Sequence, residues 1–309
     1  SNTGLAIDID VQSPQNAQPL VNNGHENYSL IFSDEFNDAY VNPYKWNVQD
    51  AFYRDRGDIK LRADGRQIEE KEGHLFIYYH MDADNADTYY AGRIDSKNKY
   101  APTYGFLEAR MHVVKPDGHQ AAFWMMPQGN GMSVPEGVDG TANDGAEIDI
   151  VESNKTTSYS TGLHWDGYGA DHKGKGGNIS ALGMHDTEYH VFGFEWSDTF
   201  LRWYFDGELV REETDPKLIP HVPQYIYFSG SMWGNSNWVD GSILTNPLIQ
   251  GGGIDEAYID YVRVYQPAVE PQPDNTTINS GKVWYDTNGK RINAHSGGIF
   301  FHNGVYYWY

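Results

Sequence analysis

Three carboxylic acids within six residues are the feature of this chain best suited to chemistry. Glu147, Asp149 and Glu152 are interleaved with isoleucine and valine, which favours a β-strand. Acidic residues disfavour strands, and like charges on one face repel each other. A strand that keeps them points to a function, and a pair of carboxyl groups is what hydrolysis of a glycosidic bond requires.

The spacing predicts an irregular strand. Side chains alternate between faces, so Glu147 and Asp149 share one face while the isoleucines between and after them point into the core. Glu152 is an odd number of residues away from Glu147, so in a regular strand its side chain would point to the opposite face. It joins the same face only if a β-bulge inserts one extra residue near Ile150 or Val151, and such bulges are common beside active sites.

Placed together, these three acids cannot all ionise freely, so at least one pKa rises. That provides a proton donor and a carboxylate nucleophile. A retaining glycosidase holds the two groups about 5–5.5 Å apart and an inverting one about 6.5–9.5 Å, so neighbours on one strand suit retention. The alternative is a solvated acidic face in a chain of net charge -21.

The surrounding segments predict an all-β fold. Short alternating runs at 75–79, 105–113, 121–126, 190–196, 201–205, 225–230 and 257–265 read as strands. The dipeptide Asp206-Gly207 marks a hairpin, and no long segment has helical periodicity. Many short strands separated by turns indicate an antiparallel β-sandwich.

Composition narrows the function classes. The chain has 309 residues, with 43 acidic residues against 22 basic ones, so nucleic acid and acidic membrane surfaces are unsuitable partners. It has no cysteine, which excludes disulfides and thiolate metal sites. No apolar run is long enough for membrane insertion as a spanning helix. Aromatic residues make up 15%, which suits both sheet cores and sugar stacking.

The domain organisation follows from shifts in composition. Residues 1–28 read as an N-terminal leader, and 29–266 as the strand-rich domain. Residues 267–282 are rich in proline and polar residues, which is typical of a linker. Residues 283–309 are too few for a core of their own, so we interpret them as the truncated start of a second domain. The alternative is a tail that packs back on the sandwich.

The segment 147–152 resembles the catalytic motif of glycoside hydrolase family 16 in its bulged form. Further similar blocks follow in the family's order, at 32–37, 90–97, 104–110, 118–127, 192–196 and 260–265, and they cover roughly residues 29–266. The resemblance implies a β-jelly-roll sandwich of two bent antiparallel sheets with an open concave cleft. It also implies endo-acting, retaining hydrolysis of a polysaccharide by a secreted, periplasmic or cell-surface enzyme, and we expect a monomer.

The resemblance also implies roles for single residues. Glu147 would be the nucleophile, Asp149 its helper and Glu152 the general acid/base. Trp124 would form a sugar platform at the cleavage point, and His164 would lie on the strand facing the catalytic one, near Glu152. Trp233 and Trp238 lie in a loop rich in glycine, asparagine and serine, and we expect both to contact sugar at the cleft rim.

A structural calcium ion is a further implication of the resemblance. Members of the family often bind one on the convex face, and Gly73 and Asp260 occupy matching positions. Oxygen ligands suit calcium. No cofactor is expected for the chemistry itself.

The substrate is predicted from weaker features. The run 119–127 and the run 164–169 look closer to agarases and porphyranases than to laminarinases, and the bulge disfavours the lichenases. Arg54 and Arg56, with Arg62 and Arg66, form an arginine cluster suited to sulfate. Acidic residues between them make ordinary surface ion pairs the alternative.

The C-terminal residues add one indication. Residues 284–298 resemble the start of glycoside hydrolase family 43 enzymes of the β-1,3-galactanase type. Together these features favour a β-linked galactan, with red-algal porphyran or agar first. The other interpretations are an endo-β-1,3-glucanase (laminarinase), an endo-β-1,3-galactanase, and a non-catalytic carbohydrate-binding protein.

Overall fold

The computed structural model describes residues 7–21, 28–129, 138–186, 189–267, 290, 299–302 and 305–308. It divides into two units, Ser1–Pro267 and Ala268–Tyr309. The predicted linker at 267–282 lies outside the described residues except for Pro267, which ends a strand. Of the predicted second domain, the described part is chiefly a hairpin of β19 (Ile299–His302) and β20 (Val305–Trp308).

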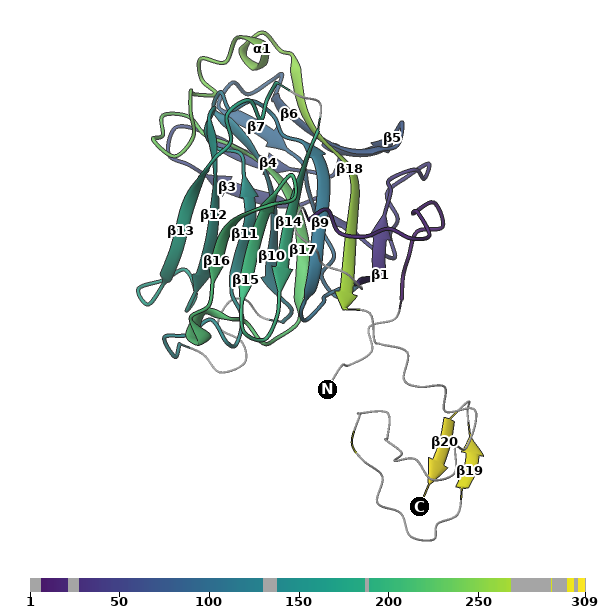
Figure 1. Ribbon diagram of the computed structural model, residues 1–309. Coiled ribbons are helices and arrows are strands. Elements are labelled where there is room, and N and C mark those ends of the chain that lie inside the picture. The colour runs from purple at the N-terminus through teal and green to yellow at the C-terminus, as the bar shows by residue number, and fades with distance from the viewer. Residues whose placement is uncertain are drawn as a thin grey trace. The chain divides into compact units, whose positions relative to one another are not determined.

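The first unit is built from two β-sheets, which overlap as two layers in the view of Figure 1. Among the described residues, one sheet has eleven strands, in the order β16-β15-β14-β9-β18-β6-β7-β4-β3, with β1 on β18 and β5 on β6. Their bounds are β1 (Tyr28–Asp34), β3 (Phe52–Asp55), β4 (Lys60–Ala63), β5 (Ile68–Lys71), β6 (His74–Met81), β7 (Thr88–Ala91), β9 (Gly105–His112), β14 (His190–Trp196), β15 (Leu201–Phe205), β16 (Glu208–Glu213) and β18 (Ile254–Pro267).

The second sheet carries the predicted catalytic strand in its interior, between two other strands. Its seven described strands run in the order β13-β12-β11-β10-β17-β8-β2. Their bounds are β2 (Asn47–Val48), β8 (Arg93–Asp95), β10 (His119–Pro127), β11 (Glu147–Glu152), β12 (Ser158–Trp165), β13 (Lys173–Ser180) and β17 (Gln224–Met232). The described helices are short: η1 (Pro216–Leu218) and α1 (Pro247–Gln250).

The all-β jelly-roll prediction is confirmed. All described strand pairs are antiparallel except β4 with β7, whose strands run parallel, so the larger sheet is mixed. The strands predicted at 190–196 and 201–205 match β14 and β15 residue for residue. β18 extends beyond its predicted run of 257–265 at both ends, because its two halves pair with different neighbours, β6 and β1.

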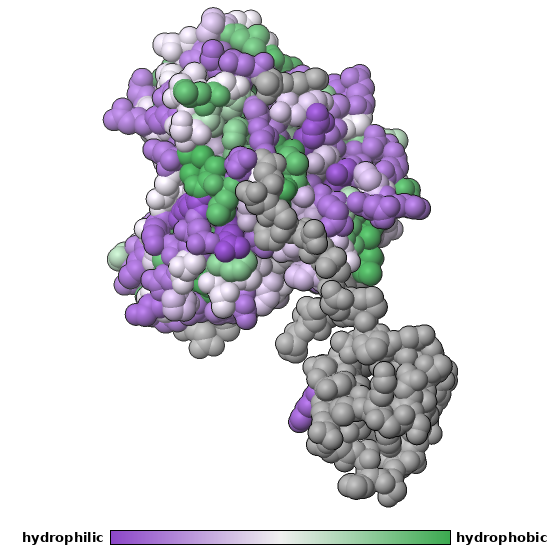
Figure 2. All heavy atoms as spheres, in the orientation of Figure 1, coloured by the Kyte–Doolittle hydropathy of each residue, from purple (hydrophilic) through white to green (hydrophobic). Residues whose placement is uncertain are grey.

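The core fills the space between the two sheets. Alternate residues of β10 point inward, and Ala121, Phe123 and Met125 are fully buried. Large aromatic side chains such as Trp203 of β15 and Tyr79 of β6 pack against them from the other sheet. Outside, hydrophobic residues are scattered among hydrophilic ones over the face that Figure 2 shows. The core therefore fixes which face of β11 is left for polar side chains.

The described part of the leader lies along β1. The backbone N–H of Asp8 donates to the carbonyl of Ile31, and the N–H of Ser33 donates back to Asp8. Further along, the N–H of Leu20 donates to the buried carboxylate of Glu108 at 2.8 Å. These contacts attach residues 7–21 to the jelly roll, and within that described segment the pairing with the sheet is an isolated bridge between Asp8 and Phe32.

Candidate active site

The predicted bulge is present in β11. Against β12, Asp149 lies opposite Gly162 and Glu152 opposite Ser160, so β11 uses one more residue than its partner. The same shift occurs against β10. Ile150 is the additional residue, and its side chain is buried. The bulge therefore restores the phase of Glu152 with respect to Glu147 and Asp149.

The acidic face of β11 is only partly open to solvent. Glu147 and Glu152 are half-buried, and Asp149 between them is buried, with 3% of its surface exposed. Desolvation raises the pKa of all three carboxyl groups above their ordinary values, and mutual repulsion adds to the rise for Glu147 and Asp149. The site therefore retains protons at pH values where exposed carboxyl groups have lost them.

A chain of hydrogen bonds holds Glu152. The indole N–H of Trp238 donates to the Gln120 side-chain oxygen at 3.0 Å, and the Gln120 amide nitrogen donates to Glu152 Oε1 at 3.2 Å. Gln120 lies on the same face of β10 as Trp124, four residues apart. Trp238 thus reaches the acid/base candidate through Gln120, and its ring is 38% exposed.

Trp124 lies beside the centre of the acidic strand. Its position in β10 is opposite Asp149, and its ring stacks on Tyr227 of β17 with centroids 4.2 Å apart. Its indole N–H donates to Ser229 at 3.0 Å. The guanidinium of Arg93 lies 5.2 Å from the Tyr227 ring and 6.0 Å from the Trp124 ring. An aromatic platform therefore lies next to the carboxylates.

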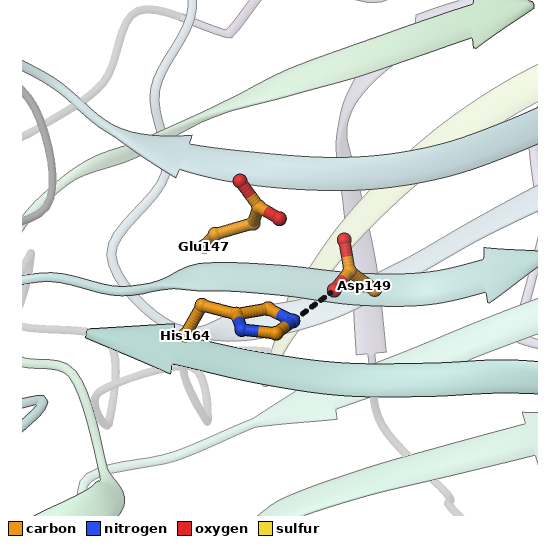
Figure 3. A group of neighbouring side chains, drawn as sticks. All are labelled: Glu147, Asp149 and His164. Atoms are coloured by element: carbon orange, nitrogen blue, oxygen red, sulfur yellow. Dashed lines mark ion pairs between the residues drawn. The ribbon is translucent and has the colours of Figure 1, made fainter. Parts of the chain in front are cut away.

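His164 contacts Asp149 rather than Glu152, which corrects the predicted position. In the antiparallel pairing it lies opposite Glu147, at the far end of the strand from Glu152. Figure 3 shows the imidazole reaching along β12, with its Nε2 3.5 Å from Asp149 Oδ2. Burial and His172 lower the pKa of His164, and burial raises the pKa of Asp149, so both shifts favour the neutral forms of the two groups.

Glycine on the neighbouring strand makes room for this contact. A Cβ at Gly162 would lie 2.5 Å from Asp149 Oδ2 and 3.3 Å from His164 Nε2. A Cβ at Gly174 of β13 would lie 2.8 Å from His164 Nδ1. The buried carboxyl and the imidazole therefore occupy space that side chains at these positions would fill.

The loop between β12 and β13 reaches the other acidic residue. Tyr168 donates a hydrogen bond from its hydroxyl to Glu147 Oε2. In the same loop, His172 Nε2 lies 3.0 Å from His164 Nδ1. The loop thus contacts Glu147 directly, and it reaches Asp149 only through His164.

The arginine cluster divides into two kinds. Arg62 pairs with Asp55 at 2.9 Å, and Arg66 pairs with Asp64, as the ion-pair alternative expected. No ion pair is recorded within the described residues for Arg54 or Arg56. Both act on the acidic strand through their charge. Arg54 opposes the rise in the pKa of Glu147, and Arg56 opposes the rise in the pKa of Glu152.

Arg56 is held in place by Trp233. Its guanidinium lies 3.3 Å from the centroid of the Trp233 ring and donates to Ser231 at 2.9 Å. Burial and the neighbouring Arg54 and Arg93 lower its pKa to about 9. A cavity of about 320 Å³ is lined by Arg54, Asp55, Arg56, Asp58 and the loop 233–236. Two arginines and two aspartates therefore line this cavity, and the charges of both arginines also act on the acidic strand.

The predicted calcium residues lie near one another. Asp260 is 3.8 Å from the ring of His74, the residue after Gly73. The other carboxylate oxygen of Asp260 pairs with Arg110 at 2.5 Å. The Asp260 carboxylate thus lies between His74 and Arg110, and calcium binding by Gly73 and Asp260 stays a prediction.

Glu147, Asp149 and His164 are, among the described residues, the one group of acids and histidines whose ligand atoms all lie within 4.8 Å of one another. We assign no metal to them, since the nucleophile role expected of Glu147 requires a carboxylate oxygen that is free to attack.

Sequence reasoning missed Gln120, Arg93, Tyr227, Tyr168 and His172 as site residues. A signal for Gln120 was available, since it shares the parity of Trp124 in a predicted strand. Arg93 and Tyr227 come from strands that are distant in sequence, and the loop residues depend on turn geometry. These have no local signature.

A jelly-roll sheet with aligned, partly desolvated carboxyl groups next to an aromatic platform is the architecture of a polysaccharide-cleaving glycoside hydrolase. Residues 29–267 match the family model described as Beta-porphyranase A-D, GH16 domain. The chain therefore belongs to glycoside hydrolase family 16.

Curated relatives of the chain act on different polysaccharides. It is 24% identical to the glucan endo-1,3-beta-glucosidase A1 of Niallia circulans, over 77% of this chain and 38% of that protein. It is 27% identical to the keratan-sulfate endo-1,4-beta-galactosidase of Sphingobacterium multivorum, over 83% of this chain and 59% of that protein. The chain thus spans less than two thirds of the length of both relatives.

Solved structures share the fold. The laminarinase catalytic domain of Thermotoga maritima has a TM-score of 0.61 at 22% identity, covering 78% of this chain and 99% of that one. A GH16 protein of Bacteroides ovatus in complex with a G4G4G3G product has a TM-score of 0.58 at 21% identity, covering 76% and 100%. Among the described residues, no helix has the length and apolar character needed to cross a membrane.

Proposed function

We propose that the chain is an endo-acting, retaining hydrolase of a β-linked galactan, with porphyran or agar as the favoured substrate. The observation that carries the proposal is the bulged strand β11, which aligns Glu147 and Glu152 on one face with Asp149 between them. Desolvation raises the pKa of both glutamates, so a proton donor and a carboxylate can coexist near neutral pH.

In the first step, an oxygen of Glu147 attacks the anomeric carbon and the bond from that carbon to the leaving oxygen breaks. Glu152 transfers its proton to the leaving oxygen, which departs as an alcohol. The products of this step are a glycosyl ester on Glu147 and an ionised Glu152. Trp124 is placed to stack on the sugar beside the cleavage point.

In the second step, water attacks the same carbon and the ester bond to Glu147 breaks. Glu152 accepts a proton from the water, which restores both groups to their starting states. The hydrogen bond that Glu152 accepts from Gln120 favours its ionised form. Burial raises the pKa of Asp149 well above the ordinary value, which favours its protonated form in both steps.

Three arginines support an anionic galactan. Arg54 and Arg93 lie close enough to Arg56 to lower its pKa. The three arginines therefore gather positive charge in a chain whose net charge is -21. A sulfate ester offers pairs of terminal oxygens that the planar fork of a guanidinium group can bind together. The family model named for porphyranases and the keratan-sulfate relative, whose name includes both sulfate and galactosidase, agree with this substrate class.

A β-1,3-glucanase is the second candidate. It is favoured by the similarity to the Niallia circulans glucan endo-1,3-beta-glucosidase. An endo-β-1,3-galactanase rests on the resemblance of residues 284–298 to family 43, most of which lies outside the described residues. A non-catalytic carbohydrate-binding protein would not need the aligned carboxyl groups. Secretion, a monomeric state and a structural calcium ion belong to this proposal as expectations.

The test is product release from porphyran, agarose, β-1,3-galactan and laminarin. We expect oligosaccharides from porphyran or agarose, and none from the Glu147→Gln variant, which should still bind the cleaved polysaccharide. A matched control is Glu208→Gln, since Glu208 lies on the strand β16 of the other sheet. Release from laminarin alone would overturn the galactan assignment, and silence on all four would overturn the substrate class.

A further inference from the structure

The β12–β13 loop, residues 166–172, has a defined conformation over the acidic strand. Asp166 is 2% exposed and adopts a left-handed backbone, with φ of 59°. Its carboxylate accepts a hydrogen bond from the N–H of Gly140 at 3.1 Å and pairs with Lys173 at 3.4 Å. The N–H of His172 donates to the carbonyl of Gly169 at 3.2 Å and closes the loop. The loop is therefore anchored at its base.

The tip of this loop places Tyr168 on Glu147. The hydroxyl donates to Glu147 Oε2 and also lies 3.8 Å from the sulfur of Met126. The ring stacks loosely on His172, with centroids 6.0 Å apart, and the residue is 64% exposed. Tyr168 is thus an exposed ring whose hydroxyl is directed at the half-buried carboxylate of Glu147, and solubility alone does not require such an arrangement.

We infer that Tyr168 is a positioning residue for the nucleophile, which it holds by a hydrogen bond to the carboxylate oxygen of Glu147 that does not attack. The inference rests on the proposed function of Glu147 and adds a role for the loop. A donor at Oε2 fixes the rotamer of the side chain and directs Oε1 towards the sugar. In the glycosyl ester Oε2 is the carbonyl oxygen, and the same donor stabilises the carboxylate as it departs.

The donor also helps to decide which glutamate carries the proton. A hydrogen bond to an ionised carboxylate favours that form, so Tyr168 favours ionised Glu147 and leaves the proton to Glu152. Other groups act on Glu147 as well. The titratable and charged groups around it are Asp149 and Glu152 on β11, His164 on β12, Arg54 on β3, Arg93 on β8, Tyr225 on β17, and Tyr168 with His172 on the loop.

The hydroxyl and the ring can be tested separately with Tyr168→Phe and Tyr168→Ala. The first readout is the pKa of Glu147 in the free full-length chain, measured by NMR titration of carboxyl-¹³C-labelled glutamate and assigned with Glu147→Gln. Tyr168→Phe should raise this pKa by about one pH unit. The matched control, Tyr44→Phe, alters a tyrosine that is 85% exposed and should leave the pKa unchanged.

The second readout is hydrolysis of whichever polysaccharide the wild-type chain cleaves. Tyr168→Phe should lower kcat about tenfold with KM within about twofold, and should move the acidic limb of the kcat/KM profile to higher pH. Tyr168→Ala should raise KM in addition, because the ring is lost. An unchanged acidic limb and an unchanged Glu147 pKa in Tyr168→Phe would overturn the inference. If the wild type cleaves nothing, the proposed function fails, and the NMR titration alone decides whether Tyr168 holds Glu147.

Discussion

Replacing Gly162 by alanine should disturb the centre of the site with a single methyl group. The new Cβ would lie 2.5 Å from Asp149 Oδ2, where real contacts do not fall below 3.0 Å. Asp149 has little freedom to retreat, because it is buried and its carbonyl accepts a hydrogen bond from Trp203 at 3.0 Å. Overpacking of this kind costs about 1–3 kcal/mol. For a chain of this size, that corresponds to a fall in Tm of about 2–10 °C.

Activity should fall further than stability. A displaced Asp149 shifts the neighbouring nucleophile, and misplacement by about 1 Å can cost on the order of 100-fold in rate. We therefore expect kcat/KM of Gly162→Ala to fall between about 10-fold and 100-fold on the cleaved polysaccharide.

The matched control is Gly177→Ala on β13, where the nearest atom to the new Cβ is Thr161 Oγ1 at 4.0 Å. Thermal melting and kcat/KM would be measured on both variants. The control should keep wild-type activity and gain a few tenths of a kcal/mol or more from reduced backbone freedom. If Gly162→Ala melts and turns over like Gly177→Ala, Asp149 does not press against β12 and the reasoning is refuted.

Glu152→Gln should raise Tm relative to wild type at about pH 8 but not at about pH 4. The pKa of Glu152 is raised in the folded state, so the wild-type free energy of unfolding falls as the pH rises from the unfolded pKa to the folded pKa. Melting curves of both proteins at the two pH values check the sign. Arg54→Ala should raise KM for porphyran at least about fivefold and leave KM for desulfated porphyran within about twofold of wild type. Arg62→Ala, which removes the ion-pair partner of Asp55, should change neither KM. Equal rises in KM on both substrates would count against sulfate recognition. Treatment with EDTA should leave the rate of hydrolysis within about twofold of the untreated chain, and a larger loss of rate without a fall in Tm would show that a metal takes part in the chemistry.

The catalytic strand could be predicted because its information is local. Glu152 is out of phase with Glu147 and Asp149 in the sequence, and a bulge is the ordinary way to restore the phase. The sandwich could be predicted for the same reason, since each strand shows its own alternation of apolar and polar residues and is bounded by turn residues next to it in the sequence.

The rest of the site depends on pairing between distant segments. His164 is predicted near Glu152, but the register of β12 against β11 places it opposite Glu147, and that register depends on how the two strands pair. Arg56 lies beside Trp233 because separate segments meet there. Tyr168 reaches Glu147 through the turn that begins at Asp166. The separation of Arg54 and Arg56 from Arg62 and Arg66 likewise depends on which acidic neighbours each one meets.

The stereochemistry of the first product tests the central assignment most directly. The measurement is ¹H NMR of the reducing end within minutes of adding the chain to the polysaccharide that it cleaves, before mutarotation mixes the anomers. Glu147 as nucleophile and Glu152 as acid/base predict that the β-anomer appears first and the α-anomer only later, as equilibrium is reached. Early appearance of the α-anomer would mean inversion by a single displacement, and would contradict a glycosyl ester on Glu147.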